Sequence, residues 1–550
     1  MLSFLQLATL VVVRDEKPSV HTAIVLILTL LIAGVAIAIT APRVKIPYPI
    51  LLIIGGLLLG FVPGLPHFTL DPDIIFLLFL PPLIYASAWT TSWRDFKDNL
   101  RPISMLAIGL VFFTTIVVAT VAHAIVPSLP WAAAFVLGAI VSPTDAIAAT
   151  AIAQRLGVPR RIVTVIEGES LVNDASGLVT YQFAVAAVVT GAFSLWSAGL
   201  LFVGESIGGI LIGLAVGWCL ALVHRRLDNP TLEIIITLLS PFASYLLADA
   251  LHTSGVLATV ATGLYMTRKS SALFSAQTRQ QALAVWNTMV FLLNALVFIF
   301  IGLELRNILD TLNATTVRHA TINLVWYAVA VSVATVLVRI VWVIPATYLP
   351  RIFIRRVRER DPYPNWRNVA VIGWTGMRGV VSLAAALAIP ELTANGQPFP
   401  ERVLIQFLTF SVILVTLVFQ GLSLPFIIRR LGLKDDGDAG REELRARQVA
   451  SHAALDRIDE LIEQGLVPTD VAEHLRKHYE ARARSIEEVT NGTEGEQEKN
   501  KFESYQHVEQ ETLKAAHDSI VELRDKGEIS DEVMHRVERE LDLQEEQLEG

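Results

Sequence analysis

The fold of this chain is decided by Val141–Tyr181, which reads VSPTDAIAATAIAQRLGVPRRIVTVIEGESLVNDASGLVTY. It places polar and charged side chains inside segments that are otherwise apolar enough to cross a lipid bilayer. These side chains are Thr144, Asp145, Glu167, Glu169, Ser170, Asn173 and Asp174. One ionisable group at membrane depth costs about 2.5–3.5 kcal/mol on insertion scales. Several such groups close together therefore predict an ion pathway.

The composition agrees with a membrane location. The 550 residues are 53% hydrophobic and only 17% charged, which is typical of a polytopic membrane protein. The formal net charge of −8 conceals arginine-rich loops before Leu433 and a strongly acidic tail after it. No basic patch belongs to a soluble module, which argues against nucleic-acid binding. The single cysteine, Cys219, allows neither an internal disulfide nor a thiolate metal site.

Thirteen apolar stretches are predicted to cross the membrane as helices. They lie near 21–40, 48–62, 73–90, 102–126, 130–153, 161–190, 196–223, 231–251, 254–267, 283–305, 321–349, 368–390 and 402–428. Arginine and lysine gather in alternate loops, and the positive-inside rule then puts the amino terminus outside and the carboxyl-terminal tail in the cytoplasm. We therefore expect a multi-pass protein of the cell (inner) membrane, with membrane lipid as its surroundings.

The domain organisation follows from the same pattern. Residues 1–20 are expected to form a leading apolar segment, because their apolar run is too short to span. Residues 21–430 are expected to form the transmembrane domain, and residues 431–550 a cytoplasmic helical tail. The predicted fold class is thus an all-α polytopic membrane protein with a small helical domain at its carboxyl end.

Two of the expected spans are interrupted. Span 130–153 contains Ser142-Pro143-Thr144-Asp145, and proline removes a helix hydrogen bond and clashes with the preceding turn. Span 368–390 contains Gly373-Trp374-Thr375-Gly376-Met377-Arg378-Gly379, where repeated glycine weakens the helix around an arginine. These are the fifth and twelfth spans, which correspond if two six-helix repeats are separated by one linking span. The odd offset makes the repeats inverted, and interrupted helices at corresponding positions of inverted halves point to a transporter site.

Asp174 is the strongest candidate for the ion-binding group. It lies about 13 residues after Arg161, roughly 20 Å along the helix and near the middle of its span. Ser170 shares its helix face, and Glu167 joins that face nearer the cytoplasm. A desolvated carboxyl group can hold either a proton or a hard monovalent cation such as Na⁺, with Thr144, Ser170 and Asn173 supplying neutral oxygens. The alternative is a buried polar network that only holds helices together.

Four further charged residues have less specific patterns. Asp145 belongs to the site by position, but it could instead cap the following half-helix and stay ionised. Arg339 lies in the middle of span 321–349 and needs an acidic partner. Glu169 is the candidate, as a structural ion pair. Arg378 would either repel or position cations, or offset the negative end of a half-helix.

The tail contains an internal repeat. Ile458-x-x-Leu461-x-x-x-Gly465-x-Val467 recurs as Ile520-x-x-Leu523-x-x-x-Gly527-x-Ile529. Each copy, at about 454–490 and 516–545, is predicted to form a helix, a glycine turn and a second amphipathic helix. Residues 491–500 are the expected linker. A cytoplasmic regulator that binds the tail would be a fitting partner.

Five short motifs carry a resemblance to a known family. They are Pro-Thr-Asp (143–145), Gly-Glu-Ser-Leu-Val-Asn-Asp (168–174), Ser-Gly-Val-Leu (254–257), Phe-Ile-Gly-Leu-Glu (300–304) and Gly-Met-Arg-Gly (376–379). Over roughly residues 20–430 the chain resembles the bacterial branch of the monovalent cation:proton antiporter-1 family, the sodium/proton exchangers. The resemblance implies a homodimer with a dimerisation part and a moving, ion-carrying part. It also implies that Asp174 binds the ion and the proton, supported by Thr144, Ser170 and Asn173, with Asp145 beside the site and Glu169 paired with Arg339.

One departure from the family is visible. Many relatives carry an acidic residue in the third span soon after paired prolines, and Leu80-Pro81-Pro82-Leu83-Ile84-Tyr85-Ala86-Ser87 contains none. An accessory role of that carboxylate in cation access therefore has no counterpart here.

The expected function is exchange of Na⁺, or another alkali cation, for H⁺. It requires no cofactor beyond the transported ions, and no enzyme signature is present. Exchange is expected to be electroneutral, because Asn173 rather than a second carboxylate stands beside Asp174. A cation channel regulated by the acidic tail is an alternative, and a cation-coupled solute symporter is a second one.

Overall fold

The computed structural model describes residues 20–44, 46–62, 74–191, 195–315, 321–433, 437–491 and 497–549. The expected leading segment, apart from Val20, lies outside these described residues. Contacts divide the chain into two compact units, Met1–Asp435 and Asp436–Gly550. Apart from an isolated bridge between Leu392 and Pro398, the regular structure of the described residues is helical.

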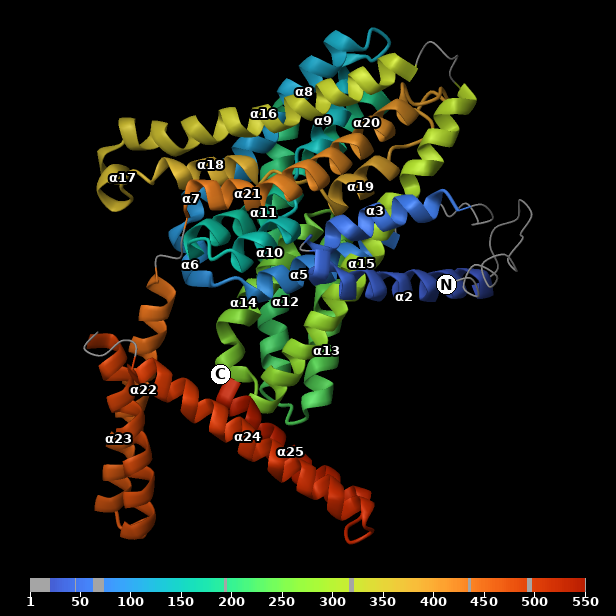
Figure 1. Cartoon of the computed structure of the whole chain (residues 1–550). Helices are drawn as coiled ribbons and strands as arrows, with labels where there is room; N and C mark the ends of the chain where they lie inside the picture. The colour runs from blue at the N-terminus through green and yellow to red at the C-terminus, as the bar shows by residue number, and fades with distance from the viewer. Residues whose placement is uncertain are drawn as a thin grey trace. The chain divides into compact units, whose positions relative to one another are not determined.

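The first unit is a bundle of helices (Figure 1). In chain order its segments are α2 (Val20–Val44), α3 (Tyr48–Gly60), η1 (Ile75–Phe79), α5 (Leu80–Thr90), α6 (Trp93–Asp98), α7 (Leu100–Ser104), η2 (Met105–Leu110), α8 (Val111–Ile125), α9 (Trp131–Val141), α10 (Ile147–Arg155), α11 (Arg160–Thr190), α12 (Leu195–His224), α13 (Pro230–Ala250), α14 (Gly255–Leu273), α15 (Ala276–Thr315), α16 (Thr321–Phe353), α17 (Arg355–Arg360), α18 (Trp366–Trp374), α19 (Val380–Leu387), α20 (Arg402–Val415), η3 (Thr416–Gln420) and α21 (Gly421–Leu431). Each of the thirteen expected spans coincides with one or more of these helices.

Among the described residues, seven segments are long and apolar enough to cross a membrane by length and composition alone. They are Ile27–Val44, Leu100–Ile125, Ala198–His224, Pro230–Ala250, Ala276–Arg306, Ile322–Phe353 and Arg402–Leu431. Three shorter apolar helices accompany them: Tyr48–Gly60, Ile75–Thr90 and Trp131–Val141. Several helices extend beyond the apolar stretch that predicted them, as α15 does at both ends, because hydropathy marks apolar surface and not the end of backbone hydrogen bonding.

Local sequence explains where several helices begin and end. The Asn229 side chain accepts hydrogen bonds from the amides of Thr231 and Leu232 at the start of α13. Ser254 accepts one from the Leu257 amide at the start of α14. These are the caps that satisfy free amides in a first turn. α11 ends at Gly191, whose φ of 70° is the left-handed conformation that glycine adopts without strain.

Two helical segments are interrupted where the sequence predicts it. α9 ends at Val141 and α10 begins at Ile147, whereas α18 ends at Trp374 and α19 begins at Val380. The two interruptions touch, since the Asp145 amide donates a 2.8 Å hydrogen bond to the Met377 carbonyl. Two non-helical stretches far apart in sequence thus satisfy each other's backbone inside the bundle, as non-helical backbone at membrane depth requires.

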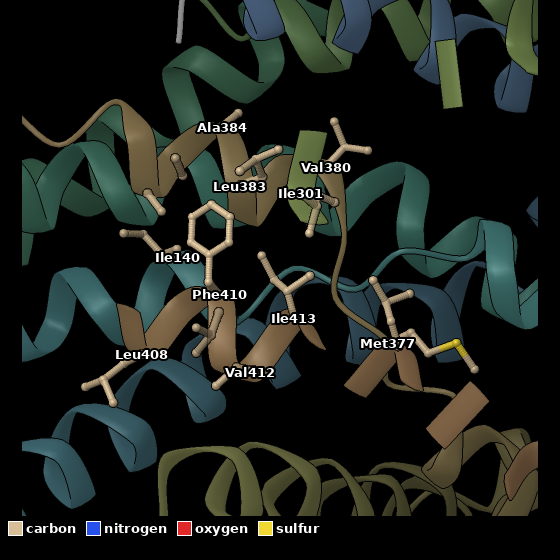
Figure 2. Packing of buried hydrophobic residues seen from close by; sticks show 14 of the residues in the cluster. Ile140, Ile301, Met377, Val380, Leu383, Ala384, Leu408, Phe410, Val412 and Ile413 are labelled. Atoms are coloured by element: carbon tan, nitrogen blue, oxygen red, sulfur yellow. The ribbon is translucent and has the colours of Figure 1, made fainter. Parts of the chain in front are cut away.

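The main apolar core packs around this crossing. Figure 2 shows Phe410 of α20 pointing toward Leu383 of α19, with Ile140 of α9 and Ile301 of α15 close by. Small residues bring the backbones near: a Cβ atom at Gly138 would lie 2.4 Å from the Thr115 carbonyl oxygen. One at Gly177 would lie 2.3 Å from Pro143 Cγ, so the loop after α9 rests directly on α11. The core therefore holds both interruptions against α11.

The second unit consists of helical hairpins. Its helices are α22 (Asp438–Glu463), α23 (Thr469–Asn491), α24 (Gln497–Asp525) and α25 (Asp531–Glu549). The turns contain Gly465 at φ 65° and Gly527 at φ 74°, a conformation suited to glycine. α22 and α24 begin well before the repeated motif, and α24 takes in the last four residues of the expected linker. Residues 492–496 lie outside the described part of the chain.

Candidate cation site

A cavity of about 240 Å³ lies beside the crossing of the two interrupted segments. Its apolar lining comes chiefly from α5 and from the first turn of α19. Its polar lining consists of Tyr48, Ser87, Thr90, Thr144, Asp145, Thr150, Glu167, Ser170, Asp174, Asn294 and Ser382. Ser87 and Thr90 are exposed, so the cavity reaches the protein surface at their end of α5. The lining is rich in oxygen atoms, which suits a hard cation.

Asp174 is the carboxylate in this cavity that has no protein partner. It is 9% exposed, and no hydrogen bond or ion pair joins it to another residue in the described part of the chain. Ser170 lies one helical turn earlier on the same face of α11 and also lines the cavity. The Ser170 hydroxyl accepts a 3.3 Å hydrogen bond from the Ala146 amide. The Asp174 carboxylate is therefore free to bind an ion.

Asp145 has a different environment. Its Oδ1 accepts a 2.8 Å hydrogen bond from the Ile147 amide at the start of α10. Its Oδ2 is buried and makes no hydrogen bond of normal geometry, but it lies against the start of α19, at Gly379. A Cβ atom at Gly379 would lie 1.9 Å from Asp145 Oδ2, so this approach requires glycine. Of the two interpretations open from sequence, the geometry favours the capping one, extended to two half-helices whose positive ends meet at one carboxylate.

Arg378 lies behind the cavity and does not line it. Its guanidinium is fully buried, and Nη1 donates to the carbonyls of Ser142 at 2.9 Å and Pro143 at 3.2 Å. These carbonyls follow the end of α9, where the negative end of a half-helix lies. Of the two roles predicted for Arg378, the contacts favour compensation of that helix end.

Glu169 and Arg339 form a buried ion pair across α11 and α16. Both side chains are 1% exposed. Arg339 Nη2 donates to Glu169 Oε2 at 2.8 Å, and Nη1 donates to Oε1. Arg339 Nε also donates to the Ile372 carbonyl at 3.0 Å. The pair thus ties α11 to α16 and α18 and lies outside the cavity lining.

A short chain of hydrogen bonds connects this ion pair to the cavity. Thr144 Oγ1 donates to Glu169 Oε1 at 2.8 Å and accepts from Asn173 Nδ2 at 2.6 Å. Thr144 therefore lines the cavity in a fixed orientation. Asn173 was predicted as an oxygen ligand, but it lies behind Thr144 and is not among the lining residues. The reason is helical geometry: one residue before Asp174 points about 100° away from it.

Glu167 is the remaining residue that the sequence predicts, and six further polar residues line the cavity without having been predicted. Glu167 lines the cavity, and Gln154 Nε2 approaches its Oε1 at 3.4 Å. Sequence reasoning missed Tyr48, Ser87, Thr90, Thr150, Asn294 and Ser382, which all line the cavity. Each is an isolated polar residue without a motif around it. Asn294 could have been recognised from the sequence, because it is an amide in the middle of the apolar span 283–305.

Comparison with known proteins places this arrangement in a family. Residues 19–430 match the family model described as "Sodium/hydrogen exchanger, transmembrane". A Mycobacterium tuberculosis protein described as an uncharacterized Na⁺/H⁺ exchanger is 36% identical, over 96% of this chain and 96% of that protein. The sodium, potassium, lithium and rubidium/H⁺ antiporter of Bacillus subtilis is 37% identical, over 70% of this chain and 58% of that protein.

A solved structure shares the fold. The sodium proton antiporter of Methanocaldococcus jannaschii superposes with a TM-score of 0.58 at 18% sequence identity, over 74% of this chain and 98% of that one. The protein is accordingly a multi-pass, all-helical membrane transporter and not an enzyme. With a family match across residues 19–430, the chain belongs to the sodium/hydrogen exchanger family of antiporters.

Proposed function

We propose that the protein exchanges Na⁺ or another alkali cation for H⁺ by alternating access at Asp174. The observation that carries this proposal is the contrast between its two cavity aspartates. Asp145 accepts a hydrogen bond from the start of α10 and lies against the start of α19, whereas Asp174 makes no hydrogen bond or ion pair with another described residue. Thr144 and Ser170 supply neutral oxygens beside it. The Bacillus subtilis relative, described as a sodium, potassium, lithium and rubidium/H⁺ antiporter, supports a choice among alkali cations.

The charge count supports electroneutral exchange. We propose that Asp145 keeps its negative charge throughout the cycle, because the positive ends of α10 and α19 favour the charged form. Glu169 keeps its charge in the pair with Arg339. Asp174 is then the group that alternates between one proton and one monovalent cation. The moving part crosses the membrane with the same charge in both directions.

We further propose thirteen transmembrane spans in two inverted six-helix repeats. The two interruptions, which fall in the fifth and twelfth helical spans and touch each other, support this arrangement. The distribution of arginine and lysine supports an external amino terminus and a cytoplasmic tail. A homodimer, with one part fixed and one part moving, fits the family and is part of the same proposal.

The test is transport by the purified full-length protein in proteoliposomes. With an imposed ΔpH and a pH-sensitive dye, addition of Na⁺, Li⁺ or K⁺ is expected to dissipate the gradient. Asp174→Asn is expected to abolish this signal while the protein still folds. Asp228→Asn is the matched control, because Asp228 is exposed in the loop before α13. Retained exchange in Asp174→Asn would refute the proposed site, and single-channel currents in a planar bilayer would favour a channel instead.

A further inference from the structure

Asn294 of α15 is a buried amide that the motifs do not explain. Its side chain is 1% exposed, and it lines the same cavity as Asp174. Neither Nδ2 nor Oδ1 makes a hydrogen bond of normal geometry. A buried amide without such partners costs folding free energy, since both atoms lose their bonds to water. An unsatisfied amide at the wall of a polar cavity is therefore a candidate ligand.

Tyr48 of α3 extends this polar wall. It lines the same cavity as Asn294 and Asp145. The Tyr48 ring packs on Phe291, with ring centroids 5.7 Å apart. Phe291 precedes Asn294 by one helical turn, so the two share a face of α15. Tyr48 and Asn294 thus bring two polar side chains, one from α3 and one from α15, to the cavity that Asp145 also lines.

The backbones that carry this pair are held in close contact. A Cβ atom at Gly56 of α3 would lie 2.2 Å from the Ile299 carbonyl oxygen of α15. A Cβ atom at Gly302 of α15 would lie 2.3 Å from the Ile53 carbonyl oxygen of α3. Neither helix can slide past the other without breaking this contact. The wall is consequently rigid, unlike one built on a loop.

The part of the cavity lining that comes from α5 contributes few polar side chains. Where α5 lines the cavity, it contributes Leu80, Leu83 and Ile84 in the interior and Ser87 and Thr90 at the exposed rim. From α3 and α15 the polar residues of the lining are Tyr48 and Asn294, and Ser382 of α19 adds a buried hydroxyl that makes no hydrogen bond. A cation that leaves water for Asp174 needs oxygen ligands on more than one side.

We propose that Asn294, together with Tyr48, is a cation-binding residue that completes the oxygen shell of the alkali cation at Asp174. This inference rests on the proposed function. Amide oxygens are good ligands for hard cations, and selectivity among such cations depends on cavity size, ligand number and rigidity. The rigid wall of α3 and α15 therefore helps to decide which alkali cation the site accepts.

The test compares Asn294→Leu with Asn287→Leu in the full-length protein in proteoliposomes. Asn287 lies two turns earlier on α15 and is exposed, so it controls for the substitution itself. Asn294→Leu is expected to raise the apparent KM for the preferred cation by about tenfold and to change the ratio of the KM values for Li⁺, Na⁺ and K⁺. Asn294→Asp keeps an oxygen ligand and is expected to keep high affinity. Asn287→Leu is expected to match the wild type.

A second measurement separates binding from packing. Because a ligand that binds the folded state stabilises it, NaCl should raise the melting temperature of the wild type above its value in choline chloride. Asn294→Leu is expected to lose most of this cation-dependent increase while melting no lower in choline chloride. A purely structural amide would leave the increase unchanged.

The outcomes distinguish this inference from the proposed function. Wild-type KM values and wild-type cation stabilisation in Asn294→Leu, with active wild type and inactive Asp174→Asn, would overturn the role of Asn294 alone. Absence of cation-driven exchange in the wild type would overturn the proposed function. If Asn294→Leu fails to fold, Asn294→Ala, which also removes the oxygen ligand, and Tyr48→Phe decide the question. Unchanged cation affinity and selectivity in both would refute the inference.

Discussion

The amide of Asp145 donates a 2.8 Å hydrogen bond to the carbonyl of Met377, which joins the two interrupted segments of the membrane unit at their centres. The Asp145 side chain then accepts a hydrogen bond from the start of α10 and lies against the start of α19. One residue therefore contributes a backbone donor to one segment and a negative charge to both. This arrangement explains why a carboxylate beside the cavity need not be the one that carries the ion.

Asp145→Asn is expected to lower the stability of the fold, whereas Asp174→Asn is not. An amide oxygen can still accept the hydrogen bond from Ile147, but it lacks the charge that offsets two helix ends. We expect a loss of about 1–2 kcal/mol of stability and a fall in exchange rate. Thermal unfolding in detergent, with both variants measured side by side, checks this. A stable Asp145→Asn variant that exchanges normally would contradict the capping role.

Gly379→Ala is expected to disrupt the crossing. The new Cβ atom would lie 1.9 Å from Asp145 Oδ2 and 2.7 Å from its Cγ, so the carboxylate or the loop must move. Overpacking of this kind costs about 1–3 kcal/mol. Gly204→Ala in α12 is the matched control, because nothing lies within 4 Å of the added atom. Transport and melting temperature should fall in the first variant and stay unchanged in the second.

The buried ion pair between Glu169 and Arg339 predicts non-additive substitutions. Glu169→Gln leaves the Arg339 charge buried without its partner, at a cost of about 3–5 kcal/mol. Arg339→Met leaves the Glu169 charge in the same situation. The double variant removes both charges and is expected to be more stable than either single one. A double-mutant cycle from denaturation in detergent provides the measurement, and simple additivity would show that the two charges do not interact.

Asp361, which follows α17, predicts a pH-dependent contribution to stability. It accepts hydrogen bonds from Arg161 and Arg351 at 2.8 and 2.7 Å, and from Arg101 at 2.7 Å. Partial burial alone would raise the pKa of Asp361, but the bonds and charges of Arg161 and Arg351 outweigh it and hold the pKa below the usual value. Because the pKa of Asp361 is lower in the folded state, its ionised carboxylate stabilises the fold at pH values above its unfolded-state pKa of about 3.9. This stabilisation is lost as the pH falls through the folded-state pKa.

Asp361→Asn is therefore expected to destabilise the protein at neutral pH, by about 1 kcal/mol for a partly exposed cluster. The difference from wild type should shrink as the pH is lowered below about 4. Unfolding measured in detergent across this range tests the sign. A difference that grows on acidification would be the opposite of what the arginine contacts predict.

Electroneutral exchange predicts insensitivity to voltage. If Asp174 carries either one proton or one cation, the exchange rate at fixed ΔpH should be the same with and without a membrane potential. Proteoliposomes with potassium and valinomycin set the potential, and Na⁺ then drives exchange. A rate that follows the imposed potential would require a second titrating group, for which Glu167 in the cavity lining is a candidate.

Much of the helical organisation was readable from sequence because it depends on local properties. A helix in lipid must satisfy its backbone hydrogen bonds within its own segment, so a long apolar stretch almost suffices to place it. Pro143 and the glycines from Gly373 to Gly379 marked the interruptions for the same reason, since their effect on the backbone is local. The end of α14 at Leu273 and the length of α15 were missed, because helices continue past the apolar surface that reveals them.

Within the site, the sequence by itself determined that Asp174 and Ser170 share a helix face and that Arg339 needs an acidic partner. The tertiary structure decided which face of α11 meets the cavity, and this moved Asn173 behind Thr144. It also decided that the Asp145 amide meets the Met377 carbonyl and that Arg378 meets the Ser142 carbonyl, contacts between residues more than 200 positions apart in sequence. Asn294 became a site residue only when α3 and α15 packed opposite the crossing. Periodicity and hydropathy report on neighbours along one helix, whereas a cavity wall is set by packing between distant helices.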